Sequence, residues 1–453
     1  MVKYKQVLVL YNIKEREEVI SHMIADILLS NGIAHEVIVG QVYEEIFHIY
    51  DYNPDLVISC LPRDNYSAAM FTMVKMVHGC AWVCIPPEGF VSLSPEVIRG
   101  FVGFNHQPKR LIDKALFWGG EVADAVAEQL LLYDKISSKQ QVGFFGYLPY
   151  EESLICKYRQ MTEQVKRIHE KSSGYGRVVM AVTARMATPV PLKEFEALYD
   201  PNDKEQNERV LKRHISNEYY AEKYIKLLET VAENNTDVLF LVKMHPRDVM
   251  YLRKNRVSST RYEHLRTISN VCFIDEEIQI SVYFDLIDTL IHYGSTTSLE
   301  AYIHGIPTIG IYNDHKDTQK NSLGCANFYA DSRFAVSDIP GVLKAIQSKM
   351  VFGRNEETEK VLYRYMNYKV GEDYHPSRLL CEHLMSIDDP LILDPSDKEV
   401  RKSLYRPNVI KRRVLFCFKM IDYSIHGDKE EARRIHDWLR KYRLARKNKP
   451  ILN

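Results

Sequence analysis

In "LVKMHPRD", residues 241–248, an apolar run ends in a histidine and several charged residues. Pro246 biases His245 toward an extended conformation, and strand alternation puts Lys243 on the same side as His245. An imidazole held there can donate to a phosphate oxygen and, when protonated, stabilise charge on a phosphate leaving group. The stretch therefore predicts a phosphate contact at His245, assisted by Lys243, whereas Asp248 and Arg247 are expected to be structural. The alternative is a histidine that caps the sheet through a backbone carbonyl.

A second candidate lies in "HYGSTTSLEAYIHGIP", residues 292–307. The apolar run stops at Gly294, and Ser295, Thr296 and Thr297 are expected to open the next helix. The first turn of a helix attracts anions through its free N–H donors and its dipole. This pattern predicts a phosphate-binding helix start, and the alternative is a well-capped helix without a ligand.

Two carboxylates lie near expected strand ends. Glu88, in "CIPPEGFVSLSP", follows two prolines and precedes a glycine, so a tight turn is expected to hold it. A carboxylate facing a cleft can act as general base toward a hydroxyl; the alternative is a solvated loop glutamate. Glu300 lies about one and a half turns into the helix after Gly294, on a different face from Ser295. Glu300 and Ser295 therefore need not reach the same group of a ligand.

Several common catalytic motifs are absent from the sequence. There is no "GxGxxG" or "GxxxxGK[ST]" loop, which disfavours a dinucleotide dehydrogenase and a P-loop NTPase. There is also no "GxSxG", "HExxH" or Asp-x-Asp motif. Cys80 and Cys84 lack a second cysteine pair or a nearby histidine pair that would complete a zinc site, so no metal site is predicted. The eight scattered cysteines fit free thiols in a reducing cytosol.

Short apolar runs alternate with helical patterns along most of the chain. Strands are expected in "AHEVIVG", "DLVISC", "AWVCIP", "DKALFWGG" and "QVGFFGY", and at residues 6–12, 177–184, 237–244, 271–275, 286–294 and 307–312. A helix is expected at 216–234 and a long loop or insertion at 190–212. Alternation of this kind predicts parallel sheets covered by helices on both faces, with ligands at the carboxyl ends of the strands.

The length of 453 residues favours two domains rather than one. We expect an α/β protein made of two doubly wound, Rossmann-like domains facing a central cleft. The expected segments are an N-terminal domain at 1–150, a linker helix at 151–176, a C-terminal domain at 177–355, crossover helices at 356–400 and a basic tail at 401–453.

The composition is that of an ordinary soluble protein, with 45% hydrophobic and 26% charged residues and a formal net charge of zero. The overall charge therefore points to no partner. No window approaches the apolar length of a membrane span, and "MVKYKQVLVLYN" lacks a signal-peptide pattern. We expect a cytoplasmic protein.

The tail at 401–453 is strongly basic, with 16 Lys and Arg against 5 Asp and Glu. Within it Ile435, Trp438, Leu439 and Tyr442 recur at helical spacing among basic residues. A basic amphipathic helix can lie on an anionic membrane surface. The alternative is a C-terminal helix packed on the body of the protein. Nucleic acid is not expected as a partner, because no recognition fold accompanies the charge.

Taken together, "KMHP", "HYGSTTSLEA", "GIP" and "PPEG" resemble the metal-independent GT-B glycosyltransferases of bacterial surface-carbohydrate synthesis. They are most similar to the enzymes that use CMP-activated ulosonic sugars, namely Kdo transferases of capsule and lipopolysaccharide and bacterial sialyl- and polysialyltransferases. Those families carry an acidic-Gly, a His-Pro and a Ser/Thr motif in this order. The resemblance covers roughly residues 1–350.

Two further resemblances keep other donors open. The pattern "DKALFWGG...QVGFFGY" also looks like teichoic-acid glycerophosphate transferases, and "GSTTSLEA...GIP" is similar to UDP-sugar GT-B enzymes and UDP-GlcNAc 2-epimerases. The sequence departs from the ulosonic-sugar group at Pro87, where many sialyltransferases carry a second acid. It also has Gly-Ser at 294–295, where others have Ser-Ser.

The resemblance implies a role for each candidate residue. His245 would contact the nucleotide phosphate and assist its departure, while Ser295 and Thr296 would bind that phosphate. Glu300 would contact the ribose or base, and Glu88 would be the acceptor-side base if the transfer inverts configuration. Donor-site neighbours would be Lys243, Pro246, Gly294 and Thr297.

The function predicted in this way is transfer of a sugar, by preference a CMP-linked Kdo or sialic acid-like sugar, to a bacterial surface polysaccharide or glycolipid. The N-terminal domain would hold the acceptor and the C-terminal domain the nucleotide sugar, which is a co-substrate, with no cofactor and no metal. The tail would bring the enzyme to the inner face of the membrane. Alternatives are a CDP-polyol glycerophosphotransferase, a UDP-sugar transferase or epimerase, and a non-catalytic scaffold of a polysaccharide assembly complex.

Overall fold

The chain forms two compact units. The first comprises Met1–Tyr158 and Leu362–Asn453, and the second comprises Arg159–Val361. The computed structural model describes residues 2–12, 14–42, 52–60, 65–86, 98, 112–133, 142–151, 154, 157–158, 162–184, 186, 204–246, 248–249, 252, 260–274, 280–315, 330–353, 356–369, 371–390 and 440.

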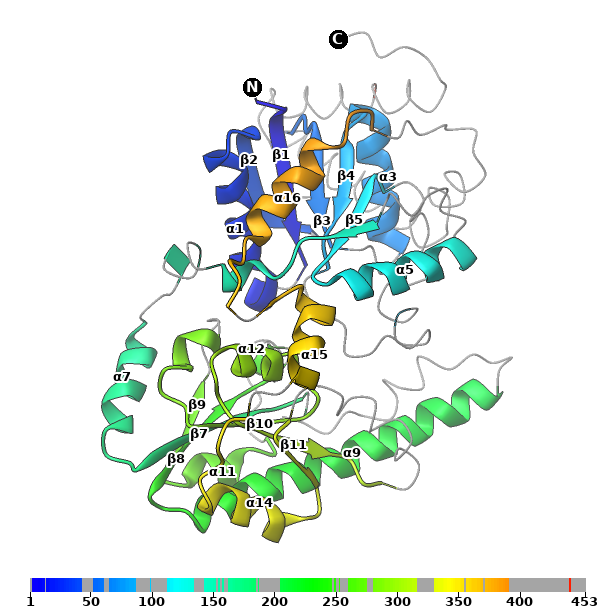
Figure 1. Ribbon diagram of the computed structural model, residues 1–453. Helices are drawn as coiled ribbons and strands as arrows, with labels where there is room; N and C mark the ends of the chain where they lie inside the picture. The colour runs from blue at the N-terminus through cyan, green and yellow to red at the C-terminus, as the bar shows by residue number, and fades with distance from the viewer. Residues whose placement is uncertain are drawn as a thin grey trace, which may run out of the picture. The chain divides into compact units, whose positions relative to one another are not determined.

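The first unit is built on a parallel six-stranded sheet with the strand order β2-β1-β3-β4-β5-β6 (Figure 1). Its strands are β1 (Tyr4–Tyr11), β2 (Ala34–Gln41), β3 (Leu56–Ser59), β4 (Ala81–Cys84), β5 (Lys114–Phe117) and β6 (Val142–Phe144). Its helical elements are α1 (Lys14–Ser30), α3 (Asn65–His78), α5 (Gly120–Tyr133), η4 (Leu148–Tyr150) and α16 (Pro376–Met385). The strand order reverses direction between β1 and β3.

A buried ion pair joins a helix of the first unit to its sheet. The ammonium of Lys75 on α3 donates to the carboxylate of Asp113, just before β5, and both side chains are almost fully buried. The same Asp113 carboxylate accepts the backbone N–H of Trp82 at 2.6 Å. Removing one partner of such a pair would leave a buried charge uncompensated, so these contacts fix α3 on the sheet.

Helix α16 comes after the second unit in the sequence but packs on the first unit. The hydroxyl of Tyr4 donates to the carbonyl of Leu384 at 2.9 Å, and Nε2 of His383 bonds the carbonyl of Phe144 at the same distance. Gly143 permits this approach, because a Cβ there would lie 2.6 Å from Cε1 of His383. Burial lowers the pKa of His383 below its usual 6.5.

This buried histidine should make stability fall in acid. Because the pKa of His383 is lower in the folded protein, the unfolded chain binds the extra proton first, and stability declines as the pH drops below 6.5. His383→Gln should remove that part of the decline, measured by urea unfolding at several pH values. His35→Gln, at an exposed position on β2, is the matched control. An unchanged pH profile in His383→Gln would contradict the assignment.

The second unit contains another parallel six-stranded sheet, with the order β12-β11-β10-β7-β8-β9 (Figure 1). Its strands are β7 (Arg177–Val182), β8 (Val238–Lys243), β9 (Val271–Ile274), β10 (Thr289–His292), β11 (Thr308–Tyr312) and β12 (Ser332–Ala335). Its helical elements are α7 (Glu163–Ser172), α9 (Lys204–Glu233), α11 (Glu263–Thr267), η5 (Ile280–Tyr283), α12 (Thr297–Ile303) and α14 (Ile339–Gln347). α15 (Glu356–Met366) follows. This is the doubly wound order in which direction reverses between β7 and β10.

Both faces of the second sheet are covered by apolar side chains. Val179 and Ala181 of β7 belong to the core cluster that α9 and α14 complete. Val178 and Met180 of the same strand belong to the cluster that α7 and η5 complete. The alternation is the two-residue period of a strand buried on both sides.

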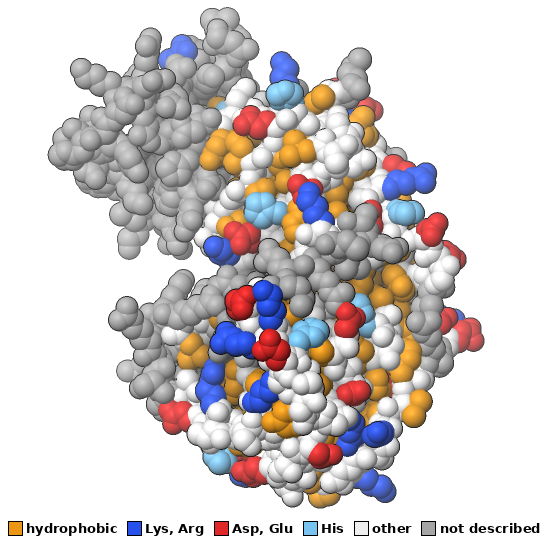
Figure 2. All heavy atoms as spheres, turned by 90° about the vertical axis from the view of Figure 1, so that its left-hand side faces the viewer, with side chains coloured by type: hydrophobic (Ala, Val, Ile, Leu, Met, Phe, Trp, Pro, Cys, Tyr) orange, Lys and Arg blue, Asp and Glu red, His pale blue; other side chains and the backbone are white. Residues whose placement is uncertain are grey.

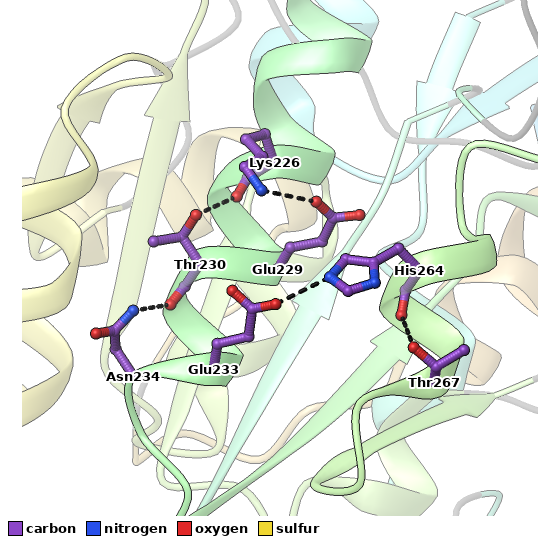
Figure 3. Close-up of polar contacts among 7 residues, drawn as sticks. All are labelled: Lys226, Glu229, Thr230, Glu233, Asn234, His264 and Thr267. Atoms are coloured by element: carbon purple, nitrogen blue, oxygen red, sulfur yellow. Dashed lines mark hydrogen bonds and ion pairs between the residues drawn. The ribbon is translucent and has the colours of Figure 1, made fainter.

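A polar contact joins helices α9 and α11 of this unit. Figure 3 shows His264 of α11 bonded to Glu233 of α9 at 2.9 Å. It also shows the hydroxyl of Thr267 donating to the carbonyl of His264 at 2.7 Å. These side chains are exposed and lie on the side of the amino ends of β8 and β9, away from the carboxyl ends, so they serve below as control positions.

The predicted fold class, an α/β protein with two doubly wound Rossmann-like units, is confirmed. The strands expected from apolar runs are all present among the described residues. The loop expected at 190–212 is wrong in part, because α9 already begins at Lys204. The first turns of α9 are polar, and this composition suggested a loop, although a long helix can include polar turns. Strand β12 was not predicted.

The face of the protein drawn in Figure 2 carries charges of both signs. Acidic and basic side chains lie interspersed on this face. Within the described part of the chain, no helix is both long and apolar enough to cross a membrane. Apart from Arg440, the basic tail lies outside the described residues.

Candidate functional site

The exit of strand β8 carries the histidine motif. Lys243 is the last residue of the strand. Met244 is buried in the apolar cluster that α9 and α14 complete, whereas His245 and Pro246 are half-buried. The N–H of His245 donates to Oγ1 of Thr183 at 3.2 Å. His245 is therefore held at the carboxyl end of β8 by Thr183, which directly follows the neighbouring strand, β7.

Thr183 links the ends of β7 and β8. Its N–H donates to the carbonyl of Lys243 at 3.0 Å, which extends the ladder by one residue beyond the last strand pair. Its hydroxyl accepts from His245 and is itself 3.5 Å from the Lys243 carbonyl. The side chain is 4% exposed, so this contact is shielded from water.

Asp248 adds a second link between the same two loops. Its carboxylate oxygen Oδ2 accepts the N–H of Met186 at 2.8 Å, and its own N–H donates to the His245 carbonyl at 2.8 Å. The Asp248 side chain is 2% exposed. These are contacts of a residue that shapes the loop, as expected for Asp248, and Arg247 lies outside the described residues.

The exit of strand β10 carries the hydroxyl motif. Gly294 has a φ of 51°, in the left-handed region that glycine adopts without strain. Oγ of Ser295 accepts the N–H of Thr297 at 3.3 Å and donates to Oγ1 of Thr297 at 3.0 Å. The carbonyl of Ser295 accepts the hydroxyl of Ser298 at 2.8 Å.

The helix after these hydroxyls starts later than expected. α12 begins at Thr297, and the side chain of its N-cap residue, Thr296, makes no capping bond. The capping hydroxyl is that of Ser295, one residue earlier, because the turn at Gly294 brings its Oγ to the Thr297 N–H. Glu300 is half-buried in the first turn of α12.

The two motifs lie near each other at the carboxyl ends of the strands of the second sheet. β8 and β10 both pair with β7, with Lys243 opposite Val182 and Ile291 opposite Ala181. Strands in a sheet are about 4.8 Å apart, so the two exits lie about 10 Å apart across β7. They flank the point where the strand order reverses, which is where open α/β sheets bind ligands. Glu88, the third candidate, lies outside the described residues.

Sequence reasoning missed the loop that follows β11. Nδ2 of Asn313 donates to Oγ of Ser216 on α9 at 2.9 Å, and the hydroxyl of Tyr219 donates to Oδ1 of Asp314 at 3.2 Å. The rings of Tyr219 and His315 lie 5.4 Å apart. The polar run "NDH" directly after "PTIGIY" was the available signal, since it is another strand exit at the same edge.

One part of the chain matches a known protein family. Residues 203–311 match the family model described as "Capsule polysaccharide biosynthesis protein". The matched segment is shorter than half of the chain and contains both the His245 and the Ser295 motifs. None of the curated proteins matches the sequence.

Several solved structures are similar to the chain at low identity. The S. aureus MnaA–UDP co-structure has 12% identity and a TM-score of 0.48, covering 87% of this chain and 99% of its own. UDP-GlcNAc 2-epimerase from Neisseria meningitidis bound to UDP-GlcNAc has 12% identity and a TM-score of 0.47, with coverages of 84% and 99%. The wall teichoic acid polymerase TagF has 12% identity and a TM-score of 0.49, with coverages of 89% and 90%. Because the scores are this low, none of them decides a substrate or a reaction.

The link through Thr183 should be measurable as stability. Thr183→Val keeps the shape of the side chain but removes the acceptor of the His245 N–H in a buried place. We expect a loss of about 1–3 kcal/mol in the free energy of unfolding, measured by urea denaturation.

Thr267→Val is the matched control, because its hydroxyl contact lies on the exposed end of α11 (Figure 3). It should stay within about 0.5 kcal/mol of the parent protein. Equal effects of the two substitutions would show that Thr183 does not hold the loop.

Proposed function

We propose that this protein is a glycosyltransferase that moves a sugar from a nucleotide donor to a bacterial surface polysaccharide or glycolipid. The observation that carries the proposal is the position of the capsule-biosynthesis match. Residues 203–311 include the strand exits with His245 and Ser295, which flank the reversal of strand order in the second unit. The preferred donor is CMP-linked, by the motif resemblance alone.

The proposed chemistry depends on positioning and on stabilisation of the leaving phosphate. His245 would donate to a phosphate oxygen, with the Lys243 ammonium adding positive potential on the same side of the strand. Ser295, Thr296 and Thr297 would face the same phosphate through hydroxyls and backbone N–H groups around Gly294. Glu300 would contact the ribose or base, and Glu88 would accept the proton of the acceptor hydroxyl in an inverting transfer. No metal is required in this scheme.

His245 is the residue whose loss should test the proposal most directly. His245→Ala should lower kcat/KM for transfer by about 10²–10⁴, the usual contribution of a positioned proton donor. The assay is sugar transfer from CMP-linked donors to capsular oligosaccharide. His264→Ala is the control, since this histidine of the same unit lies on α11 and pairs with Glu233 (Figure 3).

Thermal-shift measurements on the same variants separate binding from chemistry. CMP, rather than CDP or UDP, should raise the melting temperature of the parent protein and of His264→Ala. Selective stabilisation by UDP would point to a UDP-sugar enzyme, and by CDP to a CDP-polyol transferase. Full activity of His245→Ala would refute the role given to His245, whereas no shift with any nucleotide would refute the proposal and favour a scaffold.

We also propose that the protein works at the inner face of the membrane, attached through residues 401–453. The support is the charge of that segment, since each basic residue near an anionic surface contributes about 1 kcal/mol. The full chain should sediment with phosphatidylglycerol vesicles at low salt and not with neutral phosphatidylcholine vesicles. Equal binding to both, or binding that salt does not weaken, would refute membrane attachment of this electrostatic kind.

A further inference from the structure

The first sheet ends in a long edge strand, β2. This strand comes first in the strand order and pairs with β1 alone, from Tyr4 opposite Ala34 to Tyr11 opposite Gln41 (Figure 1). Among the described residues, no element other than β1 hydrogen-bonds to the backbone of β2. Because the N–H and C=O groups of successive residues point to opposite sides of a strand, about half of these groups in β2 face away from the sheet.

The other edge strands of the two sheets are shorter, and two of them are bonded from outside. β6 has three residues, and its Phe144 carbonyl bonds Nε2 of His383 on α16. β9 has four residues, and its Phe273 carbonyl accepts a hydrogen bond from Nε2 of Gln164 on α7 at 3.4 Å. β12 also has four residues. With eight residues, β2 has neither of these protections against pairing with another strand.

The sequence of β2, "AHEVIVGQ", suits the addition of a further strand. Val37, Ile38 and Val39 are β-branched and half-buried, and the strand contains no Lys, Arg or Pro that would block an edge. Its one acidic side chain, that of Glu36, reaches along the sheet toward β1, where Oε2 accepts a hydrogen bond from Nε2 of Gln6 at 2.8 Å. The outer side of β2 therefore offers main-chain donors and acceptors beside apolar side chains.

A second copy of the same strand complements this edge. Two copies related by a two-fold axis perpendicular to the sheet run antiparallel, so the N–H groups of each face the C=O groups of the other. An axis at Ile38 places Ile38 opposite its own copy and Val37 opposite Val39 of the partner subunit. Glu36 then lies opposite Gly40 of the partner subunit, so the two carboxylates do not face each other.

We propose that this protein forms a two-fold symmetric dimer in which two β2 strands pair antiparallel about Ile38 and join two first-unit sheets into one. The partner is a second copy of this chain, because the same edge supplies matching hydrogen-bonding groups and β-branched side chains without a like-charge contact. The pairing goes beyond the proposed transferase function and does not depend on it, since His245 and Ser295 belong to the second unit.

The full chain should sediment as a dimer. Analytical ultracentrifugation between about 1 and 100 µM measures its dissociation constant, which we expect in the micromolar range for the pairing of one strand. The dimer should persist in about 0.5 M sodium chloride, because salt screens association through the basic tail but not main-chain hydrogen bonds or apolar contacts. A protein that stays monomeric over this concentration range would overturn the proposal.

One substitution at the proposed axis has a matched control on the same face of the strand. Ile38→Lys would place two ammonium groups opposite each other and should raise the dissociation constant of the dimer about tenfold or more. Glu36→Lys introduces the same side chain opposite Gly40, and should keep the dissociation constant within about threefold of the parent value. Circular dichroism and the melting temperature establish that both variants fold. Equal dissociation constants for the two folded variants would overturn the proposal.

Ile38→Cys tests the register and decides the matter if Ile38→Lys does not fold. Directly opposite residues of an antiparallel pair have Cα atoms about 4.5–5.5 Å apart, within the range of a disulfide. With oxidised glutathione, Ile38→Cys should therefore give a covalent dimer on a non-reducing gel, above the background of the eight native cysteines. Two copies of Glu36→Cys would lie more than about 13 Å apart along the strands and should stay at that background. Any result other than preferential cross-linking of Ile38→Cys would overturn the pairing about Ile38.

Discussion

The constraint on which this structure depends is that parallel strands bury both of their faces. In the second unit, alternate residues of β7 enter two separate apolar clusters, so neither face has room for functional polar groups. Backbone N–H and C=O groups are used in the ladders. Polar chemistry is therefore displaced to the ends of the strands, and His245 and Ser295 both occur within three residues of a strand end.

The position of these strand ends could be predicted from sequence because an apolar run is a local signal. "DVLFLVKM" and "LIDTLIHYG" predict β8 and β10, and the residues that follow these runs are the candidate site residues. What holds the histidine could not be predicted in the same way. The Thr183 hydroxyl meets the His245 N–H across 62 positions of sequence, and this contact exists only because β7 and β8 are neighbours in the sheet. Periodicity within one strand contains no information about its neighbour.

Other differences have equally physical reasons. The start of α9 was read as a loop because its first residues lack an apolar stripe, yet the helix continues into buried turns that stabilise it. Glu17 lies in the polar run "KEREEV", yet it is 3% exposed and its Oε2 accepts the N–H of Asn12 at 2.7 Å, a contact that the sequence pattern does not reveal. Glu88, predicted from its turn, lies outside the described residues and remains a prediction.

The geometry at β10 also bears on how the proposed donor site would distinguish one nucleotide from another. Much of the hydrogen-bonding capacity of Ser295 is engaged within its own turn, through Thr297 and Ser298. A phosphate at this edge would thus meet groups whose positions are already fixed, which favours binding of any nucleotide but distinguishes none. Discrimination among bases needs further polar groups at the same edge. The loop Asn313–His315 is suited to this, because its contacts with Ser216 and Tyr219 anchor it to α9 beside the β10 exit. In such a site, the loop after β10 would bind the phosphate and supply affinity. The loop after β11 would contact the rest of the nucleotide and supply specificity.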